Sequence, residues 1–250
     1  MKFKSEDLQV SPDWILGFIE GDGSFCSNNK KYPSFVVFQQ DIMSLLFLKK
    51  FFNVGSIIYS DKKHGWFYNV CGRNCWPIRD FCEGRLILDW RTNQFENWKQ
   101  LKRIPFNKRE ANYKEVNFSD WLIGFIEAEG SFTCSSGKYK YPMFSLAQDD
   151  RKILETVKNF FKVGFIGKTG NDSSWEYRVT GRNCWVTRLF CENKLISRKK
   201  KAQFKKWKKL RWIPIPSEFI PKMEEKTRLI EVIYKDTKGR EKYSLFNFGE

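Results

Sequence analysis

Two carboxylates occupy matching places in a segment that occurs twice in the chain. The copies DWILGFIEGDGSF (13–25) and DWLIGFIEAEGSF (120–132) place Asp22 and Glu129 after an apolar run and directly before a glycine. We expect the run to be helical, so each acid falls at a helix C-terminus, where the helix dipole disfavours negative charge. Two such carboxylates held close together would resist ionisation, and a divalent cation would remove that conflict. Because carboxylate oxygens are hard ligands, the pair predicts a Mg²⁺ site.

Small residues on the same helices indicate how the helices meet. Gly17 and Gly21 are four residues apart in the first copy, as Gly124 and Ala128 are in the second. Small side chains at that spacing allow two helix backbones to approach closely. Since the segments are copies, we expect them to pack side by side about a pseudo-twofold axis. The plainer interpretation is a buried helix pair with solvated end carboxylates, and the duplication in a basic chain disfavours it.

The rest of the chain repeats along with these helices. The matching segments are GRNCW at 72–76 and 181–185, FCE at 81–83 and 190–192, and Tyr32-Pro33 and Tyr141-Pro142. A repeat of this length indicates two homologous halves. We therefore divide the chain into a first half (1–105), a polar linker (106–118), a second half (119–216) and an unpaired C-terminal extension (217–250).

Periodicity and capping residues give each half the same order of elements. Ser11 and Ser119 are expected as N-caps of the first helices, and Gly23 and Gly130 as the C′ residues at which they end. Two strands, a helix, two strands and closing helices follow, written αββαββα, with the closing helices near 74–83, 90–103, 183–193 and 199–211. The fold class is α+β, with two pseudo-twofold-related halves, saddle-shaped antiparallel sheets and the paired helices at their interface. In the extension, 229–234 and 243–248 predict a hairpin.

The overall charge points to a polyanionic partner. The 250 residues include 45 Lys or Arg against 29 Asp or Glu, which gives a net charge of +16. The densest basic run is 198–211, in which Phe204 and Trp207 are expected as core anchors and the surrounding charges as phosphate contacts. A hydrophobic content of 41% excludes a disordered chain. No stretch approaches the roughly 18 apolar residues of a membrane span, and residues 1–10 lack the apolar core of a secretory signal.

The seven cysteines lack the spacing of a metal site. There is no CxxC pair and His64 is the only histidine, which argues against a structural zinc ion. The odd count favours reduced thiols inside a cell. Cys75 and Cys82 are seven residues apart, as are Cys184 and Cys191, so each pair would share one face of a helix and is predicted to be buried.

The duplicated helices carry a family resemblance. ILGFIEGDG (15–23) and LIGFIEAEG (122–130) resemble the LAGLIDADG motif of homing endonucleases, in the single-chain form with two repeats. The resemblance continues through the GSF after each motif, the YPxF strand, the FFxVG segment and a closing helix that ends in F-x-x-W, and covers about 10–212. It implies a monomeric, site-specific endonuclease that hydrolyses both strands of double-stranded DNA with Mg²⁺, two or three divalent ions being shared between the halves. Such enzymes leave short 3′ overhangs and promote intron mobility.

The same resemblance assigns roles to individual residues. Asp22 and Glu129 match the metal-binding acids, and the backbone carbonyls of Gly21 and Ala128 join the coordination. Glu20 and Glu127, the other acids of the motif, are expected to form hydrogen bonds around the helix pair. The polar residue that positions water near the metals matches Gln148 in the second half and Gln39 or its neighbour Gln40 in the first. The basic residues that add positive charge match Arg91 and Lys200.

Alternate strand residues are the expected base contacts. Successive side chains of a strand point to opposite faces, so counting by two from the metal acids selects one face of each sheet. That face can lie along the major groove, where arginine suits guanine. The predicted DNA-binding residues are Ser24, Cys26, Asn28, Lys30, Arg73, Ser131, Thr133, Ser135, Arg178 and Arg182.

Two other functions remain open at this point. A maturase of the same fold would bind intron RNA and assist splicing with little or no DNA cleavage, and a DNA-binding regulator would have lost catalysis altogether. The retention of both Asp22 and Glu129 disfavours an inactive protein, because no structural need for a carboxylate is evident there. The composition, rich in Lys, Asn, Phe and Ile, fits an AT-rich coding sequence, and the resemblance implies an intron-encoded protein of a mitochondrion or chloroplast.

Overall fold

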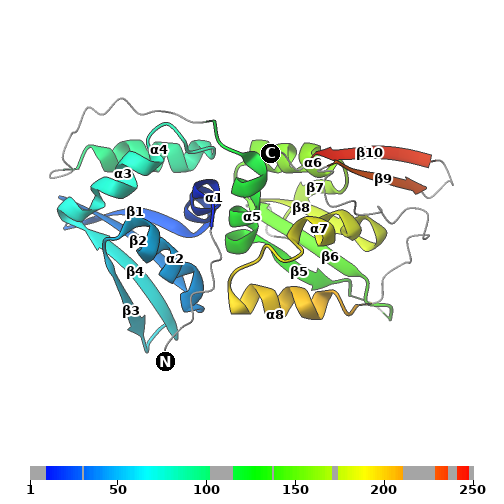
Figure 1. The fold of residues 1–250 in the computed structure, drawn as a ribbon, viewed down its shortest axis with the longest axis horizontal. Coiled ribbons are helices and arrows are strands. Elements are labelled where there is room, and N and C mark those ends of the chain that lie inside the picture. Colours follow the sequence, from blue (N-terminus) through cyan, green and yellow to red (C-terminus); the bar gives the residue numbers. More distant parts are fainter. Residues whose placement is uncertain are drawn as a thin grey trace. The chain divides into compact units, whose positions relative to one another are not determined.

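A computed structural model describes residues 10–29, 31–101, 115–136, 138–170, 174–210, 229–235 and 241–247. The contacts divide the chain into two compact units. One comprises residues 1–128 together with 196–199, and the other comprises 129–195 together with 200–250. The chain therefore passes from one unit to the other three times. Two of these passages lie within a helix. Each unit contains one four-stranded antiparallel sheet (Figure 1).

The first unit follows the predicted element order. Its sheet has the strand order β1-β2-β4-β3. Two helices close the first half, as expected near 74–83 and 90–103, and a short 3-10 turn precedes them. The elements are α1 (Pro12–Asp22), β1 (Gly23–Asn28), β2 (Tyr32–Gln39), α2 (Ile42–Phe52), β3 (Ser56–Ser60), β4 (Gly65–Cys71), η1 (Gly72–Cys75), α3 (Trp76–Cys82), α4 (Asp89–Lys99) and α5 (Phe118–Glu129).

The second unit repeats this arrangement in its own sheet, of strand order β5-β6-β8-β7. The register also repeats, since Phe35 pairs with Val70 in the first sheet and Phe144 pairs with Val179 in the second. The elements are β5 (Ser131–Cys134), β6 (Pro142–Gln148), α6 (Arg151–Phe161), β7 (Phe165–Lys168), β8 (Trp175–Thr180), η2 (Gly181–Asn183), α7 (Cys184–Cys191) and α8 (Arg198–Trp207), which starts in the first unit.

Each core lies on the helix-covered face of its sheet. In the second unit the ring of Phe132 contacts Phe204 at 5.0 Å and Trp207 at 5.1 Å between ring centroids. Trp207 Nε1 also donates a hydrogen bond of 2.9 Å to the carbonyl of Met143. Phe204 and Trp207 are therefore core anchors, as predicted from the sequence. They fix α8 on the helix-covered face, opposite the face that carries Ser131 and Thr133.

The ends of the duplicated helices correct one prediction and refine another, since the helices end before Gly23 and Gly130 as expected. Ser119 is not an N-cap, because α5 already begins at Phe118 and the side chain of Asn117 accepts a hydrogen bond from the amide of Asp120. Gly23 is extended, with φ −73° and ψ 149°, and Gly130 does not have positive φ either. A glycine is needed at position 23 for space, since a Cβ there would lie 2.5 Å from the carbonyl oxygen of Ile19. Ser11, by contrast, caps α1 as predicted.

Several simpler predictions are confirmed. The hairpin of the extension forms from β9 (Leu229–Lys235) and β10 (Glu241–Asn247), which pair antiparallel. All seven cysteines are free thiols, and Cys75, Cys82, Cys184 and Cys191 are fully buried. Among the described residues no helix has both the length and the apolar character to cross a membrane.

Candidate active site

The site depends on a close contact between α1 and α5. A Cβ placed on Gly17 would lie 1.9 Å from the carbonyl oxygen of Trp121, and one on Gly124 would lie 2.0 Å from the carbonyl oxygen of Trp14. No side chain larger than hydrogen fits at either position, and the contact is reciprocal, as expected of two copies. Gly21 and Ala128 lie about one turn further along their helices, beside the two helix ends.

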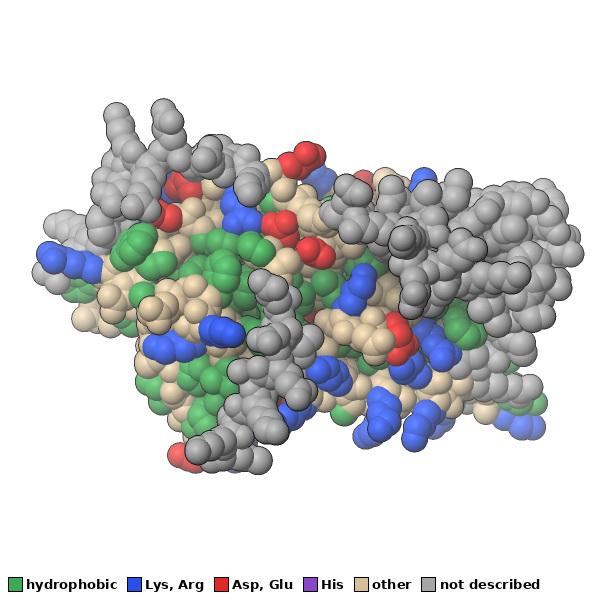
Figure 2. All heavy atoms as spheres, in the orientation of Figure 1, with side chains coloured by type: hydrophobic (Ala, Val, Ile, Leu, Met, Phe, Trp, Pro, Cys, Tyr) green, Lys and Arg blue, Asp and Glu red, His purple; other side chains and the backbone are tan. Residues whose placement is uncertain are grey.

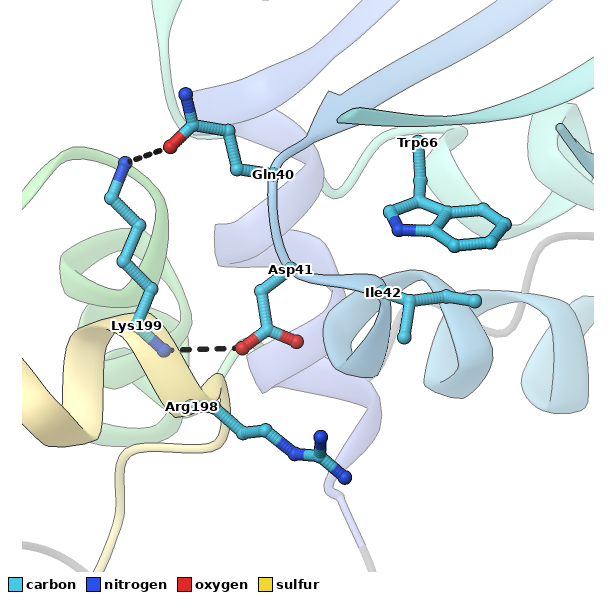
Figure 3. A pocket seen from close by; sticks show the side chains of 6 residues that line it. All are labelled: Gln40, Asp41, Ile42, Trp66, Arg198 and Lys199. Carbon is cyan, nitrogen blue, oxygen red and sulfur yellow. Dashed lines mark hydrogen bonds between the residues drawn. The ribbon is translucent and has the colours of Figure 1, made fainter. Parts of the chain in front are cut away.

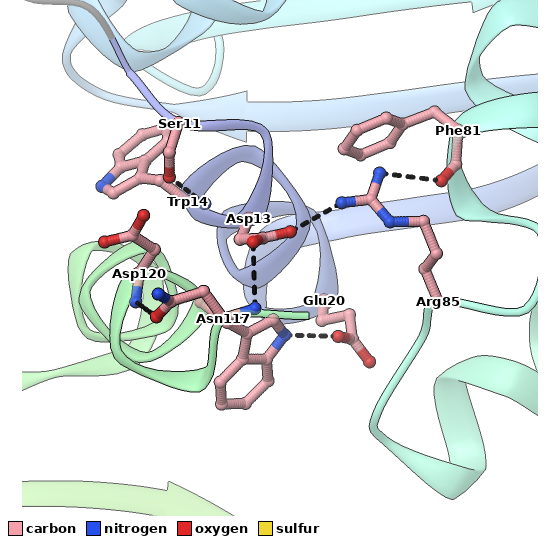
Figure 4. Close-up of polar contacts among 9 residues, drawn as sticks. Ser11, Asp13, Trp14, Glu20, Phe81, Arg85, Asn117 and Asp120 are labelled. Carbon is pink, nitrogen blue, oxygen red and sulfur yellow. Dashed lines mark hydrogen bonds and ion pairs between the residues drawn. The ribbon is translucent and has the colours of Figure 1, made fainter. Parts of the chain in front are cut away.

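Glu20 is buried inside this helix pair and both of its carboxylate oxygens accept hydrogen bonds, one of which is drawn in Figure 4. Its Oε2 accepts from Trp121 Nε1 at 2.5 Å, and its Oε1 accepts from the amides of Ile87 at 2.8 Å and Leu88 at 2.7 Å. Burial raises the pKa of Glu20 to about 7, against the opposing effect of these donors and of Arg91. The carboxylate thus joins α1 to α5 and also fixes the segment that leads into α4.

Glu127 has the equivalent role in the second copy. Its two oxygens accept from the amides of Ile196 at 2.7 Å and Ser197 at 3.0 Å, in the segment that leads into α8. The symmetry is incomplete, because the indole nitrogen of Trp14 is buried without a hydrogen-bond partner among the described residues. Trp121, the equivalent residue, donates to Glu20. The expectation that both acids form hydrogen bonds around the helix pair is therefore met, with unequal partners.

Asp22 is the last residue of α1 and is half-buried. The side-chain amide of Gln39, at the end of β2, donates a short hydrogen bond to Asp22 Oδ2. Gln40 points elsewhere, because it is exposed and its Oε1 accepts from Lys199 Nζ at 2.8 Å. Of the two candidates, Gln39 is thus the glutamine beside the acid.

Arg91 is a buried cap of α1. Its Nε and Nη2 donate to the carbonyl of Glu20 at 3.1 and 2.9 Å, and Nη2 also donates to the carbonyl of Gly21 at 3.0 Å. Only 4% of its surface is exposed. A cation at a helix C-terminus stabilises the helix dipole and offsets the charge of an acid placed there. In the second unit Lys200 Nζ donates to a carbonyl one residue beyond the acid, that of Gly130.

The remaining second-half residues take matching places. Glu129 ends α5 and is half-buried, as is Ala128. Gln148 ends β6 and is 8% exposed, at the strand position that Gln39 has in β2. The two glutamines lie opposite equivalent tryptophans, Gln39 opposite Trp66 and Gln148 opposite Trp175.

The alternating strand residues lie on the face that the helices leave open. In β1 the ring of Phe25 enters the core, so Ser24, Cys26 and Asn28 point to the other face, and Asn28 is exposed. In β5 Phe132 is the core residue, and Ser131 and Thr133 point away from it. Counting by two along β1 and β5 therefore selects residues that share the open face of each sheet. Ser135 lies just beyond β5, and Lys30 lies outside the described residues.

The predicted arginines differ in their surroundings. Arg73 in η1 is exposed, and Arg182 in η2 is half-buried. Arg178 belongs to the open face of the second sheet, where it forms an ion pair with Glu176 and lies 5.9 Å from the ring centroid of Phe165. The bond to Glu176 uses Nη2 of a guanidinium that has five N–H donors in all.

Lys and Arg side chains gather over α8 (Figure 2). The exposed ones are Arg198, Lys199, Lys201, Lys205, Lys206 and Lys209. They surround the buried pair Phe204 and Trp207, so the basic surface is the outer side of a helix anchored by aromatic rings.

The donor atoms beside Asp22 suit a hard cation. Within the described residues no three His, Cys, Asp or Glu side chains come together, so a site made only of such side chains is absent there. Asp22 contributes carboxylate oxygens, the carbonyl of the preceding Gly21 accepts from Arg91, and Gln39 presents its amide nitrogen to Asp22. A carboxylate with a backbone carbonyl fits Mg²⁺, which keeps several of its waters, better than it fits zinc.

One structural group was not predicted from the sequence. Asp13, in the first turn of α1, forms an ion pair of 2.6 Å with Arg85 and accepts from the amide of Asn117 at 3.0 Å (Figure 4). It therefore joins the start of α1 to the start of α5. The repetition of DW before each motif was the available signal, although it does not indicate what Asp13 contacts.

Residues 122–211 match the family described as LAGLIDADG endonuclease. The second half of the repeat thus matches the LAGLIDADG endonuclease family. A probable intron-encoded endonuclease 4 from Neurospora crassa is 30% identical over 137 residues, which is 49% of this chain and 24% of that protein. A probable intron-encoded endonuclease Cox1-I1b from Schizosaccharomyces pombe is 29% identical over 154 residues, covering 48% and 40%. The chain thus spans less than half the length of these LAGLIDADG relatives.

Solved LAGLIDADG structures share the fold. The meganuclease I-AabMI bound to uncleaved DNA has a TM-score of 0.63 and 19% identity, over 79% of this chain and 89% of that one. I-SmaMI bound to an uncleaved DNA target in the presence of calcium ions has a TM-score of 0.55 and 20% identity, over 80% and 90%. At these identities the likeness establishes the architecture of two α+β halves with four-stranded antiparallel sheets.

Proposed function

We propose that the protein is a site-specific homing endonuclease that cuts both strands of a long DNA target and leaves short 3′ overhangs. The observation that carries this proposal is Asp22 at the end of α1, held by Gln39 and lying next to a carbonyl that is capped by the buried Arg91. A basic protein with an acid so placed is suited to phosphodiester hydrolysis, because a carboxylate and backbone carbonyls are the hard ligands that Mg²⁺ prefers.

The chain's own residues would divide the work of each half-site. Asp22 and Glu129, with the carbonyls of Gly21 and Ala128, would hold two or three Mg²⁺ ions shared between the halves. These ions would supply Lewis-acid neutralisation of the phosphate charge. Gln39 and Gln148 would orient water, and Arg91 and Lys200 would keep positive charge beside the acids.

Recognition would come from the open faces of the two sheets. Side chains at alternate positions of a strand can follow successive bases in the major groove. Ser24, Cys26, Asn28, Lys30, Arg73, Ser131, Thr133, Ser135, Arg178 and Arg182 are the proposed contacts. The basic residues of α8 and of the loops would meet phosphates, which position the protein without reading sequence. The names of the relatives support an intron-encoded origin, and we extend this to a monomer that acts in an organelle.

Cleavage of the intron-free host-gene sequence is the decisive experiment. With Mg²⁺ present, we expect double-strand cutting by the wild type and none by Asp22→Asn or Glu129→Gln, since neither variant can hold the cation. Both variants should still bind the target, because they lose negative charge near phosphates. Intact DNA combined with tight binding of the intron RNA would instead identify a maturase.

A further inference from the structure

Asp41 stands between two helices that belong to different halves of the repeat. Its Oδ1 accepts a hydrogen bond of 2.9 Å from the amide of Met43 and so caps α2. Its Oδ2 accepts a hydrogen bond of 3.1 Å from the amide of Lys199, in the first turn of α8 (Figure 3). One carboxylate therefore satisfies the free amides of two helix N-termini, where negative charge is favourable.

The neighbouring residues strengthen this connection. Gln40 Oε1 accepts from Lys199 Nζ at 2.8 Å, so the backbone and the side chain of Lys199 are both held by the end of β2. Trp66 and Ile42 line the same cavity of about 340 Å³ with these residues and Arg198. Figure 3 shows Lys199 bonded to both Gln40 and Asp41. The residue directly before Gln40 is Gln39, which contacts Asp22.

The anchored residue directly precedes Lys200. Lys200 is the proposed basic residue of the second half-site, and its Nζ donates to the carbonyl of Gly130. The segment 196–199 is held by Glu127 at its first two amides and by Asp41 at its last. We propose that Asp41, in the first half, is a positioning residue that fixes the orientation of Lys200 in the second. The end of β2 would then hold Gln39 beside Asp22 and also hold the helical turn that carries Lys200.

The other half offers a matched comparison. Asp150 occupies the equivalent place and caps α6 through a bond of 2.9 Å from the amide of Lys152. Within the part of the chain that the structure describes, this cap is the one hydrogen bond that Asp150 accepts, whereas Asp41 accepts one from each of two helices. The two half-sites should consequently differ in their response to the same substitution.

The inference rests on the proposed endonuclease function, and it is tested by measuring each strand separately. Asp41→Asn keeps an oxygen for the Met43 amide but presents an NH₂ group to the Lys199 amide, so it removes only the bond to α8. Asp150→Asn makes the same change where no second bond exists. The substrate is a duplex labelled on either strand, and a supercoiled plasmid with the same target reports nicked circles.

We expect Asp41→Asn to lower the cleavage rate of one strand about tenfold relative to the other, so that nicked circles accumulate. A misplaced catalytic group lowers the rate without abolishing binding. Lys200→Met should slow the same strand, and Asp150→Asn should keep the wild-type ratio. Equal slowing of both strands, an unchanged ratio, or slowing of the strand that Arg91→Met affects would overturn the inference. A wild type that cuts neither strand would instead refute the proposed function.

Discussion

At the scale of single residues, the acids of the repeat are divided by their surroundings. Glu20 has three N–H donors around a buried carboxylate, whereas Asp22, two residues on, is half-buried and has a side-chain amide at one oxygen. The first arrangement holds elements together, and the second leaves Asp22 partly exposed at the end of the helix. Two carboxylates on one helix thus receive different tasks because one lies inside the helix pair and the other at its end.

The raised pKa of Glu20 predicts a pH-dependent stability. Burial raises the pKa from 4.5 to about 7, so between these values the folded protein binds more protons than the unfolded chain. The contribution of this group is complete below pH 4.5 and is lost as the pH rises through about 7, an effect on the order of 3 kcal/mol. Glu20→Gln should therefore flatten the dependence of the urea midpoint on pH in that window.

Trp121→Phe provides the matching test of cause. It removes a donor that lowers the pKa of Glu20, so the upper end of the window should move to higher pH. A slope between pH 4.5 and 7 that persists unchanged in Glu20→Gln would show that another group titrates there.

At the scale of elements, the contact between α1 and α5 depends on the absence of two side chains. Gly17 and Gly124 let the backbone of each helix contact a carbonyl of the other. Helix propensity alone would disfavour glycine at both positions. The repeat uses glycine where alanine would make a better isolated helix. Packing therefore decides these positions, and helix propensity does not.

Gly17→Ala should destabilise the protein although it improves helix propensity. The new Cβ would meet a backbone carbonyl at 1.9 Å, which cannot move aside as a flexible side chain could. We expect a loss of about 2–3 kcal/mol in the free energy of unfolding, measured with urea. Gly167→Ala is the control, since nothing lies within 4 Å of a Cβ there, and it should change stability by less than about 0.5 kcal/mol. Equal stabilities of the two variants would refute the close contact.

At the scale of the whole molecule, the charge of +16 is distributed over surfaces of different kinds. Lys63 lies over the rings of Phe38 and Phe67, on the open face of the first sheet, and Arg73 is exposed beyond β4. The lysines of α6 and α8 project from helices that cover the opposite face of the second sheet. The salt dependence of DNA binding can separate these sets.

Replacing Lys63 and Arg73 with Gln should lower the slope of log K against log salt by about 0.9 per lost phosphate contact, hence by nearly two. Lys152→Gln with Lys158→Gln removes the same charge from the outer side of α6 and should leave the slope unchanged. Lys205→Gln with Lys206→Gln then decides whether α8 meets phosphates as the sequence suggests. Equal slopes for the Lys63/Arg73 and Lys152/Lys158 variants would exclude the open face as the DNA surface.

The sequence by itself determined the features that repeat and alternate. The two halves, the antiparallel strands, the buried Phe204 and Trp207 and the open-face residues such as Ser24 all follow from local periodicity, because a side chain's face is fixed by its position along a regular strand or helix. Local rules failed at the ends of the duplicated helices. There the cap of α5 moved to Asn117, and Gly23 proved to be needed for space.

Only the tertiary structure decided which distant residues meet. It chose Gln39 over Gln40 as the neighbour of Asp22, buried Arg91 against the carbonyls of α1, and joined Asp41 to the start of α8. None of these contacts leaves a period in the sequence, since each depends on how separate elements are turned toward one another. A repeated sequence predicts equal halves, and the different partners of Asp41 and Asp150 arise because the fold gives identical residues unequal surroundings.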